Sequence, residues 1–133
     1  MASMVDSCIL LDIFSEDPPW FEWSSAVVAE QADQGPLVIN SVIYAEVSIN
    51  VVSIEELERH LPPEVFQFRP IPREAAFMAG KCFLQYRRRG GAKATVLPDF
   101  LIGAHAAVEN LTLITRDPRR FRQYYPTVHL ICP

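Results

Sequence analysis

Four acidic residues at widely separated positions are the side chains of this sequence best suited to chemistry: Asp6, Glu46, Asp99 and Asp117. Carboxylates that lie close together repel one another, so a cluster of them needs a cation between them. Their hard oxygen atoms suit Mg²⁺ or Mn²⁺ and not zinc. If the fold brings them together, the four residues predict a metal site that can serve catalysis.

A phosphodiester is the natural substrate for such a site. Mg²⁺ keeps several water ligands and commonly works with the phosphates of its substrate. One or two ions can activate a water for attack on a backbone phosphate and stabilise the leaving oxygen. The acids stand 40, 53 and 18 positions apart and form no local motif. Their meeting therefore depends on the fold.

Each of the three aspartates also has a plausible role as a helix cap. Asp99 follows Pro98, and Asp117 precedes Pro118, which suits the first position of a helix. Asp6 stands beside Ser7 at the start of another predicted helix. Capping and metal binding are compatible, so both roles stay open for these residues.

Glu46 is different because it lies inside a predicted helix. On that helix it shares a face with Val42, Ile43 and Asn50. A carboxylate on an apolar face is costly unless it is paired or bound to a cation. An arginine partner or a metal ion would each satisfy this requirement.

The elements that must position these acids alternate between short apolar runs and helix-like stretches. Strands are predicted at residues 3–5, 37–39, 111–115 and 127–131, and residues 66–68 are either strand or loop. Helices are predicted at residues 7–14, 20–34, 41–52 (capped by Ser41), 53–61, 72–89 and 99–109, and a short one opens at Asp117-Pro118. This alternation predicts a single α/β domain over residues 1–133, with a parallel sheet covered by helices on both faces.

Such a sheet would bring the acids to one place. Residues just beyond the carboxyl ends of parallel strands meet in one crevice. Asp6 and Asp117 each follow a predicted strand, Asp99 opens a helix, and Glu46 lies one to two turns into the helix after the second strand. We therefore expect all four carboxylates at the same edge of the sheet.

Composition places the chain among ordinary globular proteins. Half of its 133 residues are hydrophobic, and no apolar run is long enough for a transmembrane helix. Asp6 and Asp12 interrupt the N-terminal apolar stretch, so a signal peptide is not expected. Cys8, Cys82 and Cys132 are odd in number and lack CxxC spacing, which predicts neither disulfides nor a zinc site. A reducing cytoplasm fits this pattern.

Charge is distributed unevenly along the chain. Residues 1–60 carry eleven acids and one base, whereas residues 61–133 carry five acids and eleven bases. Such asymmetry can mark a nucleic-acid surface, although an ordinary uneven surface would look the same. The bases best placed to hold RNA phosphates are Arg116, Arg119, Arg120 and Arg122, because Arg116 adjoins Asp117; a second group is Arg87, Arg88, Arg89 and Lys93. Helix ends also attract arginine for other reasons.

Four segments of the chain resemble the acidic motifs of PIN-domain nucleases, and most closely those of VapC-type toxins of toxin–antitoxin pairs. These segments are Val5-Asp6-Ser7, Tyr44-Ala45-Glu46-Val47, the run from Pro98 to Ala106, and Leu113-Ile114-Thr115-Arg116-Asp117. The resemblance covers nearly the whole chain. It implies a three-layer α/β/α sandwich and Mg²⁺- or Mn²⁺-dependent endoribonuclease activity.

The resemblance also assigns roles to individual residues. Asp6, Glu46 and Asp99 match the three central acids of the family, and Asp117 matches the fourth. Thr115 matches a hydroxyl position beside that fourth acid. We predict the four acids as catalytic metal ligands, and Thr115 and Arg116 as residues near the RNA substrate.

Partners follow from the same resemblance. Toxins of this family are held inactive by a cognate VapB-like antitoxin, whose C-terminal segment lies in a groove near the active site, and they are usually homodimers. Trp20, Phe21 and Trp23 are candidates to line that groove, although core packing is the alternative. We expect a cytoplasmic protein that binds RNA and no membrane.

Two other functions deserve comparison. An aspartate-based phosphatase needs a second Asp two positions after the first, where this chain has Cys8, and a receiver-like protein needs a nearby lysine, for which only Lys81 and Lys93 exist. A non-catalytic interaction module with the same fold would not need the four acids. His105 lies six positions after Asp99 and points away from it on a helix, which predicts a structural role.

Overall fold

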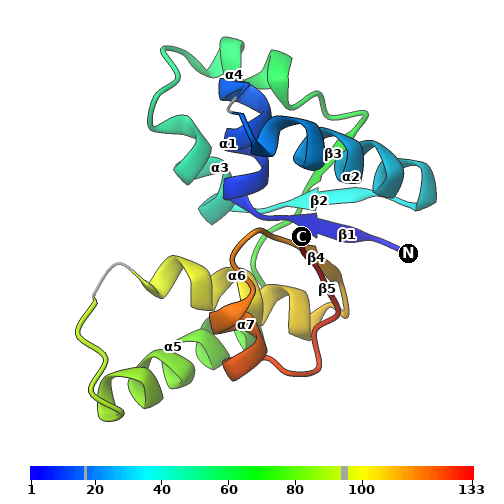
Figure 1. Ribbon diagram of the computed structural model, residues 1–133. Helices are drawn as coiled ribbons and strands as arrows, with labels where there is room; N and C mark the ends of the chain where they lie inside the picture. Colours follow the sequence, from blue (N-terminus) through cyan, green and yellow to red (C-terminus); the bar gives the residue numbers. More distant parts are fainter. Residues whose placement is uncertain (17, 94–95) are drawn as a thin grey trace.

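Five short parallel strands form the centre of the molecule in the order β3-β2-β1-β4-β5 (Figure 1). The structure is a computed structural model that describes residues 1–16, 18–93 and 96–133. The strands in this part of the chain are β1 (Ser3–Val5), β2 (Leu37–Ile39), β3 (Phe66–Phe68), β4 (Thr112–Ile114) and β5 (Leu130–Ile131). The segment at residues 66–68, which the sequence left open, is therefore a strand.

The three inner strands are buried along their whole length. Every residue of β1, β2 and β4 is buried, as expected for a parallel sheet covered on both faces. Met4 at the centre of β1 pairs with Val38 on one side and Leu113 on the other. The first and the last quarter of the chain thus meet at the middle of the sheet.

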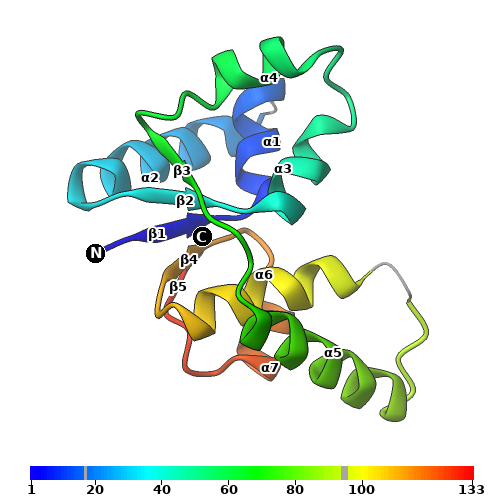
Figure 2. The same cartoon turned by 180° about the vertical axis from the view of Figure 1, so that it is seen from behind.

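Helices cover both faces of the sheet, which confirms the predicted α/β/α sandwich. Their bounds are α1 (Ser7–Ser15), α2 (Trp20–Gln34), α3 (Ser41–Ser48), α4 (Ile54–His60), α5 (Arg73–Arg88), α6 (Leu97–Val108) and α7 (Arg119–Tyr124). Figures 1 and 2 show α1, α2 and α4 on one side and α5, α6 and α7 on the other. Helix α3 contacts both α1 and α6, so it joins the two outer layers near the predicted crevice.

Three helix starts differ from the sequence-based prediction. One is that of α7, which begins at Arg119 with Pro118 at the cap position, so Asp117 does not cap it. The cap of α3 is Asn40 and not Ser41, because the Asn40 Oδ1 accepts a hydrogen bond from the Ile43 amide at 3.0 Å. This helix ends at Ser48, short of the predicted residue 52. Helix α6 begins at Leu97, so Asp99 lies in its first turn and does not cap it.

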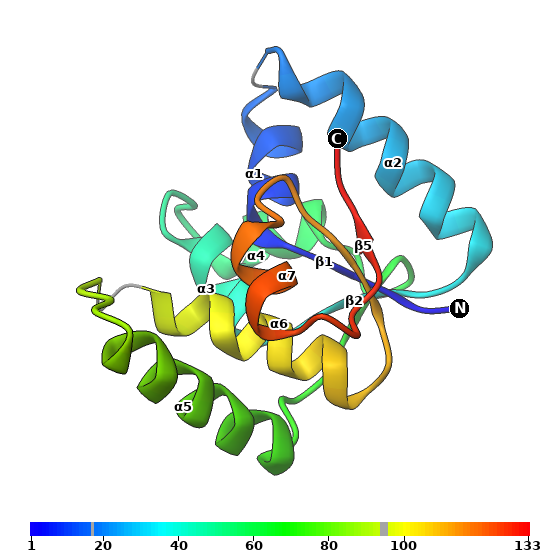
Figure 3. The same cartoon turned by 60° about the horizontal axis from the view of Figure 1, so that its bottom comes forward.

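Small residues let α6 pack closely against the C-terminal part of the chain. A side chain at Gly103 would overlap the ring of Tyr125, and Ala104 and Ala106 are fully buried. The Tyr125 hydroxyl donates a hydrogen bond to the Phe100 carbonyl at 2.8 Å. Figure 3 shows α7 lying across α6. This packing fixes the first turn of α6, which carries Asp99, beside α7.

Two further features bear on the sequence-based expectations. No helix within the described ranges is long and apolar enough to span a bilayer. Cys8, Cys82 and Cys132 are all free thiols, as their number and spacing predict.

Candidate active site

The four predicted acids face a common region at the carboxyl end of the sheet. Asp6 directly follows β1, and Asp117 lies three residues after β4, the strand that pairs with β1. Glu46 comes from α3 and Asp99 from the first turn of α6. Each of Asp6, Glu46 and Asp99 feels the negative charge of at least one other member of the group. The fold therefore brings together residues that share no local motif.

Asp6 is almost fully buried and has two fixed hydrogen-bond partners. Its Oδ1 accepts from the Ser7 amide at 2.8 Å, which makes it the N-cap of α1. Its Oδ2 accepts from the Thr115 hydroxyl at 2.7 Å. Burial raises the pKa of Asp6 to about 6, the Thr115 hydrogen bond opposes this, and the charge of Asp99 adds to it. Asp6 is therefore a cap and also a carboxylate that a cation would stabilise.

Thr115 forms hydrogen bonds to both Asp6 and Asp117. Its side chain is fully buried. Its hydroxyl donates to Asp6 and accepts from the Asp117 amide at 3.1 Å. This geometry favours a role in positioning the Asp6 carboxylate and the backbone of Asp117 over the substrate contact predicted for Thr115.

Glu46 is half-buried and bonded to a hydroxyl. Its Oε1 accepts from the Ser7 Oγ at 2.8 Å, and no arginine or lysine in the described part of the chain pairs with it. Desolvation raises the pKa of Glu46, the Ser7 hydrogen bond opposes this, and the charge of Asp99 raises it further. Ser7 thus contacts Asp6 through its amide and Glu46 through its side chain.

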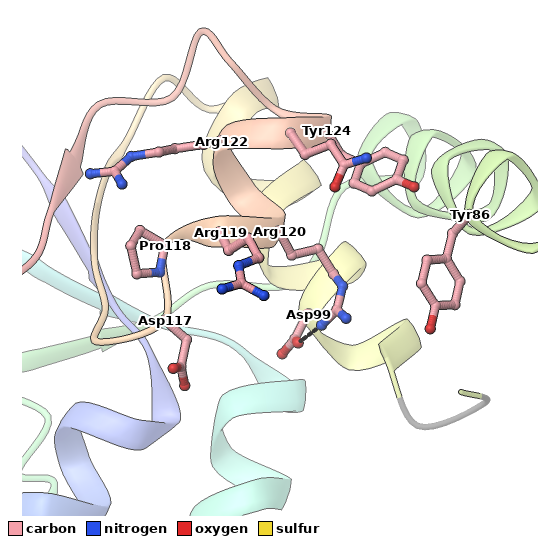
Figure 4. Close-up of a pocket in the computed structure, with 9 residues that line it drawn as sticks. Tyr86, Asp99, Asp117, Pro118, Arg119, Arg120, Arg122 and Tyr124 are labelled. Atoms are coloured by element: carbon pink, nitrogen blue, oxygen red, sulfur yellow. Dashed lines mark hydrogen bonds and ion pairs between the residues drawn. The ribbon is translucent and has the colours of Figure 1, made fainter. Parts of the chain in front are cut away.

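Asp99 forms an ion pair with Arg120. The Arg120 Nη1 lies 2.8 Å from the Asp99 Oδ2 (Figure 4). Burial raises the pKa of Asp99, the guanidinium opposes this, and the charge of Asp117 raises it. Sequence reasoning placed both residues near the site but gave no sign that they pair.

Arg116 points to a different part of the molecule. It donates two hydrogen bonds to Asp12, from Nε at 2.7 Å and from Nη2 at 3.0 Å. Asp12 is buried and also accepts from the Ser24 hydroxyl at 2.8 Å. The Arg116 guanidinium lies 5.0 Å from the ring of Trp20. These contacts favour a structural role for Arg116 over the RNA contact predicted from its place beside Asp117.

His105 is buried away from the acids, as the sequence analysis predicts. Its Nδ1 lies 3.0 Å from the side-chain nitrogen of Asn40, and its Nε2 lies 2.9 Å from Glu109. Because Asn40 uses its oxygen to cap α3, its nitrogen must donate to His105. His105 therefore supports the start of the helix that carries Glu46.

The four carboxylates are the kind of ligand that a hard cation prefers. In the conformation of this structure, however, their side chains do not surround a metal site. Within residues 1–16, 18–93 and 96–133, no three acids, histidines or cysteines are gathered closely enough to hold a metal ion. One reason is that the Asp99 carboxylate is engaged by the Arg120 guanidinium. The Cys8 thiol lies 3.6 Å from Asp6, and burial raises its pKa to about 12. The thiol is therefore neutral and a poor metal ligand. Oxygen donors alone suit Mg²⁺ or Mn²⁺.

A cavity of about 760 Å³ opens beside Asp99 and Asp117 (Figure 4). Its lining consists of these two acids and residues of α5 and α7, namely Tyr86, Pro118, Arg119, Arg120, Arg122, Gln123 and Tyr124. Three of the four arginines predicted to hold RNA phosphates lie here, and Arg116 does not. A volume of this size accommodates a small ligand or a short piece of a polymer.

The family model of the PIN domain matches residues 3–125 of the chain. The chain belongs to the PIN domain family. Several solved structures share its fold over nearly its whole length, although the search of curated proteins gave no match. They include chains from VapBC2 of Rickettsia felis bound to promoter DNA, and from VapBC-1 of nontypeable Haemophilus influenzae.

The Rickettsia chain aligns with a TM-score of 0.75 at 20% identity, over 100% of this chain and 99% of its own length. The Haemophilus chain aligns with a TM-score of 0.73 at 21% identity, over 99% and 98%. A chain of a toxin–antitoxin complex from Klebsiella pneumoniae aligns with a TM-score of 0.63 at 25% identity, over 95% and 94%. This PIN domain therefore has the same architecture as these chains.

The sequence does not predict the contacts that two residues make in the site. The sequence places Ser7 beside Asp6, at the start of a helix and in the first acidic motif, but does not predict that its hydroxyl donates to Glu46. Arg120 was grouped with RNA-binding arginines, yet it contacts Asp99. A serine or arginine of this kind carries no signal in the sequence, because its partner lies 39 or 21 positions away.

Proposed function

We propose that this PIN domain is a Mg²⁺- or Mn²⁺-dependent endoribonuclease and the toxin of a VapBC-like toxin–antitoxin pair. The observation that carries the proposal is the meeting of Asp6, Glu46, Asp99 and Asp117 at the carboxyl end of the sheet, beside a cavity lined by arginines. A carboxylate cluster next to cationic side chains suits a metal ion and a polyanionic substrate.

The four acids would hold the metal. When bound, the ion would lower the pKa of a water and neutralise charge on the phosphate oxygens. Ser7 and Thr115 keep Glu46 and Asp6 in fixed orientations. Asp99 and Asp117 border the cavity, so either carboxylate would be available as a general base there.

The basic wall of the cavity would hold the RNA backbone. Arg119 and Arg122 come from α7 and line the same cavity as Asp117. Guanidinium groups bind phosphate oxygens through two parallel hydrogen bonds. The basic character of the C-terminal half would then have a function, because that half supplies the arginines proposed to bind the substrate.

A cleavage assay on structured and single-stranded RNAs tests this function. Wild type should cleave with Mg²⁺ or Mn²⁺ and not with chelator, and Asp6→Asn and Asp99→Asn should lose at least about 100-fold in rate. Asp33→Asn removes an exposed acid of α2 and should cleave like wild type. If wild type and both active-site variants cleaved equally in chelator, the proposal would be wrong.

The antitoxin partner rests on a second observation. A largely apolar groove of about 300 Å³ lies between α1 and α2 and is closed by residues near α4 and β3. Its lining includes Leu10, Phe14 and Val28, and none of the predicted Trp20, Phe21 and Trp23. Trp23 instead packs against the core. We place the C-terminal segment of a VapB-like antitoxin in this groove.

Co-expression with the product of the adjacent small gene tests the partner. The two chains should purify together, and Val28→Glu should separate them, because it places a charge in the groove. Glu30→Gln, on an exposed part of the same helix, should leave the complex intact. Homodimerisation remains a prediction that light scattering on the isolated chain can check.

A further inference from the structure

Arg120 is the one arginine or lysine in the described part of the chain that forms an ion pair with any of the four acids. It donates from Nη1 to Asp99 Oδ2 at 2.8 Å. A guanidinium is charged at every accessible pH. A permanent cation therefore already lies on one of the carboxylates that the proposed metal would use.

Two aromatic rings flank this guanidinium. Its central carbon lies 5.6 Å from the ring centre of Tyr86 on α5 and 6.0 Å from that of Phe100 on α6. Phe100 is fully buried, so its ring is held in place. Cations over aromatic faces are attracted by the negative face of the ring. The rings thus favour a position of the Arg120 guanidinium near the site in addition to the ion pair.

The ion pair itself is easily exchanged. The side chains of Arg120 and Asp99 are 29% and 38% exposed, and pairs of this exposure contribute little net free energy. Breaking the pair does not leave a buried charge without solvent, since Arg120 also lines the open cavity. A divalent cation on Asp99 would therefore displace Arg120 at small cost and leave its donors free to bind another anion.

On the basis of the proposed function, we propose that Arg120 is a phosphate-binding residue that occupies Asp99 until the metal does. Metal and guanidinium compete for the Asp99 carboxylate. Once the metal binds there, Arg120 turns its donors to a backbone phosphate of RNA in the adjoining cavity. The planar fork of arginine suits this exchange, because carboxylate and phosphate present similar pairs of oxygens.

The first measurement is metal affinity without RNA. Titration calorimetry with Mn²⁺ should show Arg120→Gln binding the ion about 3- to 5-fold more tightly than wild type, the range expected when a half-exposed competing ion pair is removed. Arg122→Gln removes the same charge from the same helix and cavity, but its guanidinium contacts Cys132. This control should change the affinity less than 2-fold.

The second measurement is single-turnover RNA cleavage at saturating Mn²⁺. Arg120→Gln should lose about 10- to 100-fold in kcat/KM, as expected for a hydrogen bond to a charged phosphate. Arg120→Lys keeps the charge and should recover part of this loss. Circular dichroism of both variants confirms the fold.

Tighter metal binding combined with weaker cleavage is the signature of the exchange, since a merely structural arginine would weaken both. If Arg120→Gln bound Mn²⁺ no more tightly than Arg122→Gln, or cleaved RNA as well as wild type, the proposal would be overturned. Failure of the proposed function is seen separately, in a wild-type protein that binds no Mn²⁺ or cleaves no RNA.

Discussion

At the scale of single residues, the site is built from carboxylates that also have structural duties. Asp6 caps α1 and accepts a hydrogen bond from Thr115, while Glu46 is held by Ser7. These two acids are therefore already oriented before a ligand binds, which lowers the entropy lost on binding. The same burial that orients Asp6 raises its pKa to about 6.

The raised pKa of Asp6 predicts opposite pH dependences for metal binding and for the stability of the metal-free protein. Metal binding needs the carboxylate, so Mn²⁺ affinity should fall as pH drops through about 6. Without metal, the folded state favours the protonated form, so the stability from this group is present below the ordinary pKa of 3.8 and is lost as pH rises through about 6. Calorimetric titration from pH 5 to 8 and thermal unfolding in chelator from pH 4 to 8 check the two trends.

Asp6→Asn separates these effects. Asparagine can still accept from the Ser7 amide but carries no charge, so relief of the buried charge should stabilise the variant in chelator at pH 7.5 by up to about 3 kcal/mol. The lost hydrogen bond from the Thr115 hydroxyl offsets part of this gain. It should show no rise in Tm on adding Mn²⁺. A variant less stable in chelator than Thr115→Val, which loses the same hydrogen bond but keeps the charge, would contradict the assigned cause of the pKa shift.

Thr115→Val tests the hydroxyl that joins Asp6 to Asp117. The substitution keeps the shape of the buried side chain but removes a donor to Asp6 and an acceptor for the Asp117 amide. We expect a loss of about 1–3 kcal/mol in the free energy of unfolding, measured in urea, and weaker Mn²⁺ binding. Thr112→Val, a buried threonine of β4 with only a 3.7 Å contact to a sulfur, should change neither quantity much.

At the scale of elements, the sequence predicts most of what the structure contains. The helix at Trp20–Gln34 has the predicted bounds, because prolines precede it and Gly35-Pro36 ends it. The inner strands were recognisable as short apolar runs. The prediction of Ser41 as the cap of α3 is wrong by one residue, since Asn40 and Ser41 are both good caps and the sequence does not distinguish them. In the structure the Asn40 side chain caps the helix and also contacts His105.

Asn40 is therefore the residue on which the position of α3 depends. Asn40→Ala removes the hydrogen bond to the Ile43 amide and the donor to His105, and should cost about 2 kcal/mol in urea unfolding. Because α3 carries Glu46, Mn²⁺ affinity should also fall. Ser53→Ala removes the exposed cap of α4 and should cost less, with no change in metal affinity. Equal effects of the two variants on Mn²⁺ binding would show that α3 does not depend on its cap.

At the scale of the whole molecule, the order of the strands brings together residues whose contact no local sequence pattern could predict. Placing β1 between β2 and β4 sets Asp6 beside Thr115 and Asp12 beside Arg116, pairs that are 109 and 104 positions apart. Sequence reasoning could place the acids at the carboxyl ends of strands, but not say which side chains they would meet. Pairings between distant residues follow from strand order, and strand order has no signature in one sequence.

The pair of Asp12 and Arg116 gives this long-range link a test. Asp12 is buried and bonded twice to Arg116 and once to Ser24. Asp12→Asn removes the charge that holds the arginine, which should cost about 3–5 kcal/mol because a partly buried guanidinium loses its partner. The loop that carries Asp117 should then move, so Mn²⁺ affinity should fall although residue 12 touches none of the four acids. Asp33→Asn, with the same chemical change at an exposed position, should be neutral in both measurements.

The double variant Asp12→Asn/Arg116→Gln, compared with the two single variants, decides whether Arg116 holds the loop or binds RNA. If the arginine serves to hold the loop, removing both partners should cost less stability than the sum of the single variants, and the loss of Mn²⁺ affinity should equal that of Asp12→Asn alone. If Arg116 instead binds RNA, Arg116→Gln should weaken RNA binding at high Mn²⁺ while Asp12→Asn leaves it unchanged. The bidentate geometry and the Trp20 ring beneath the guanidinium favour the first outcome, and the second would restore the substrate role predicted from the sequence.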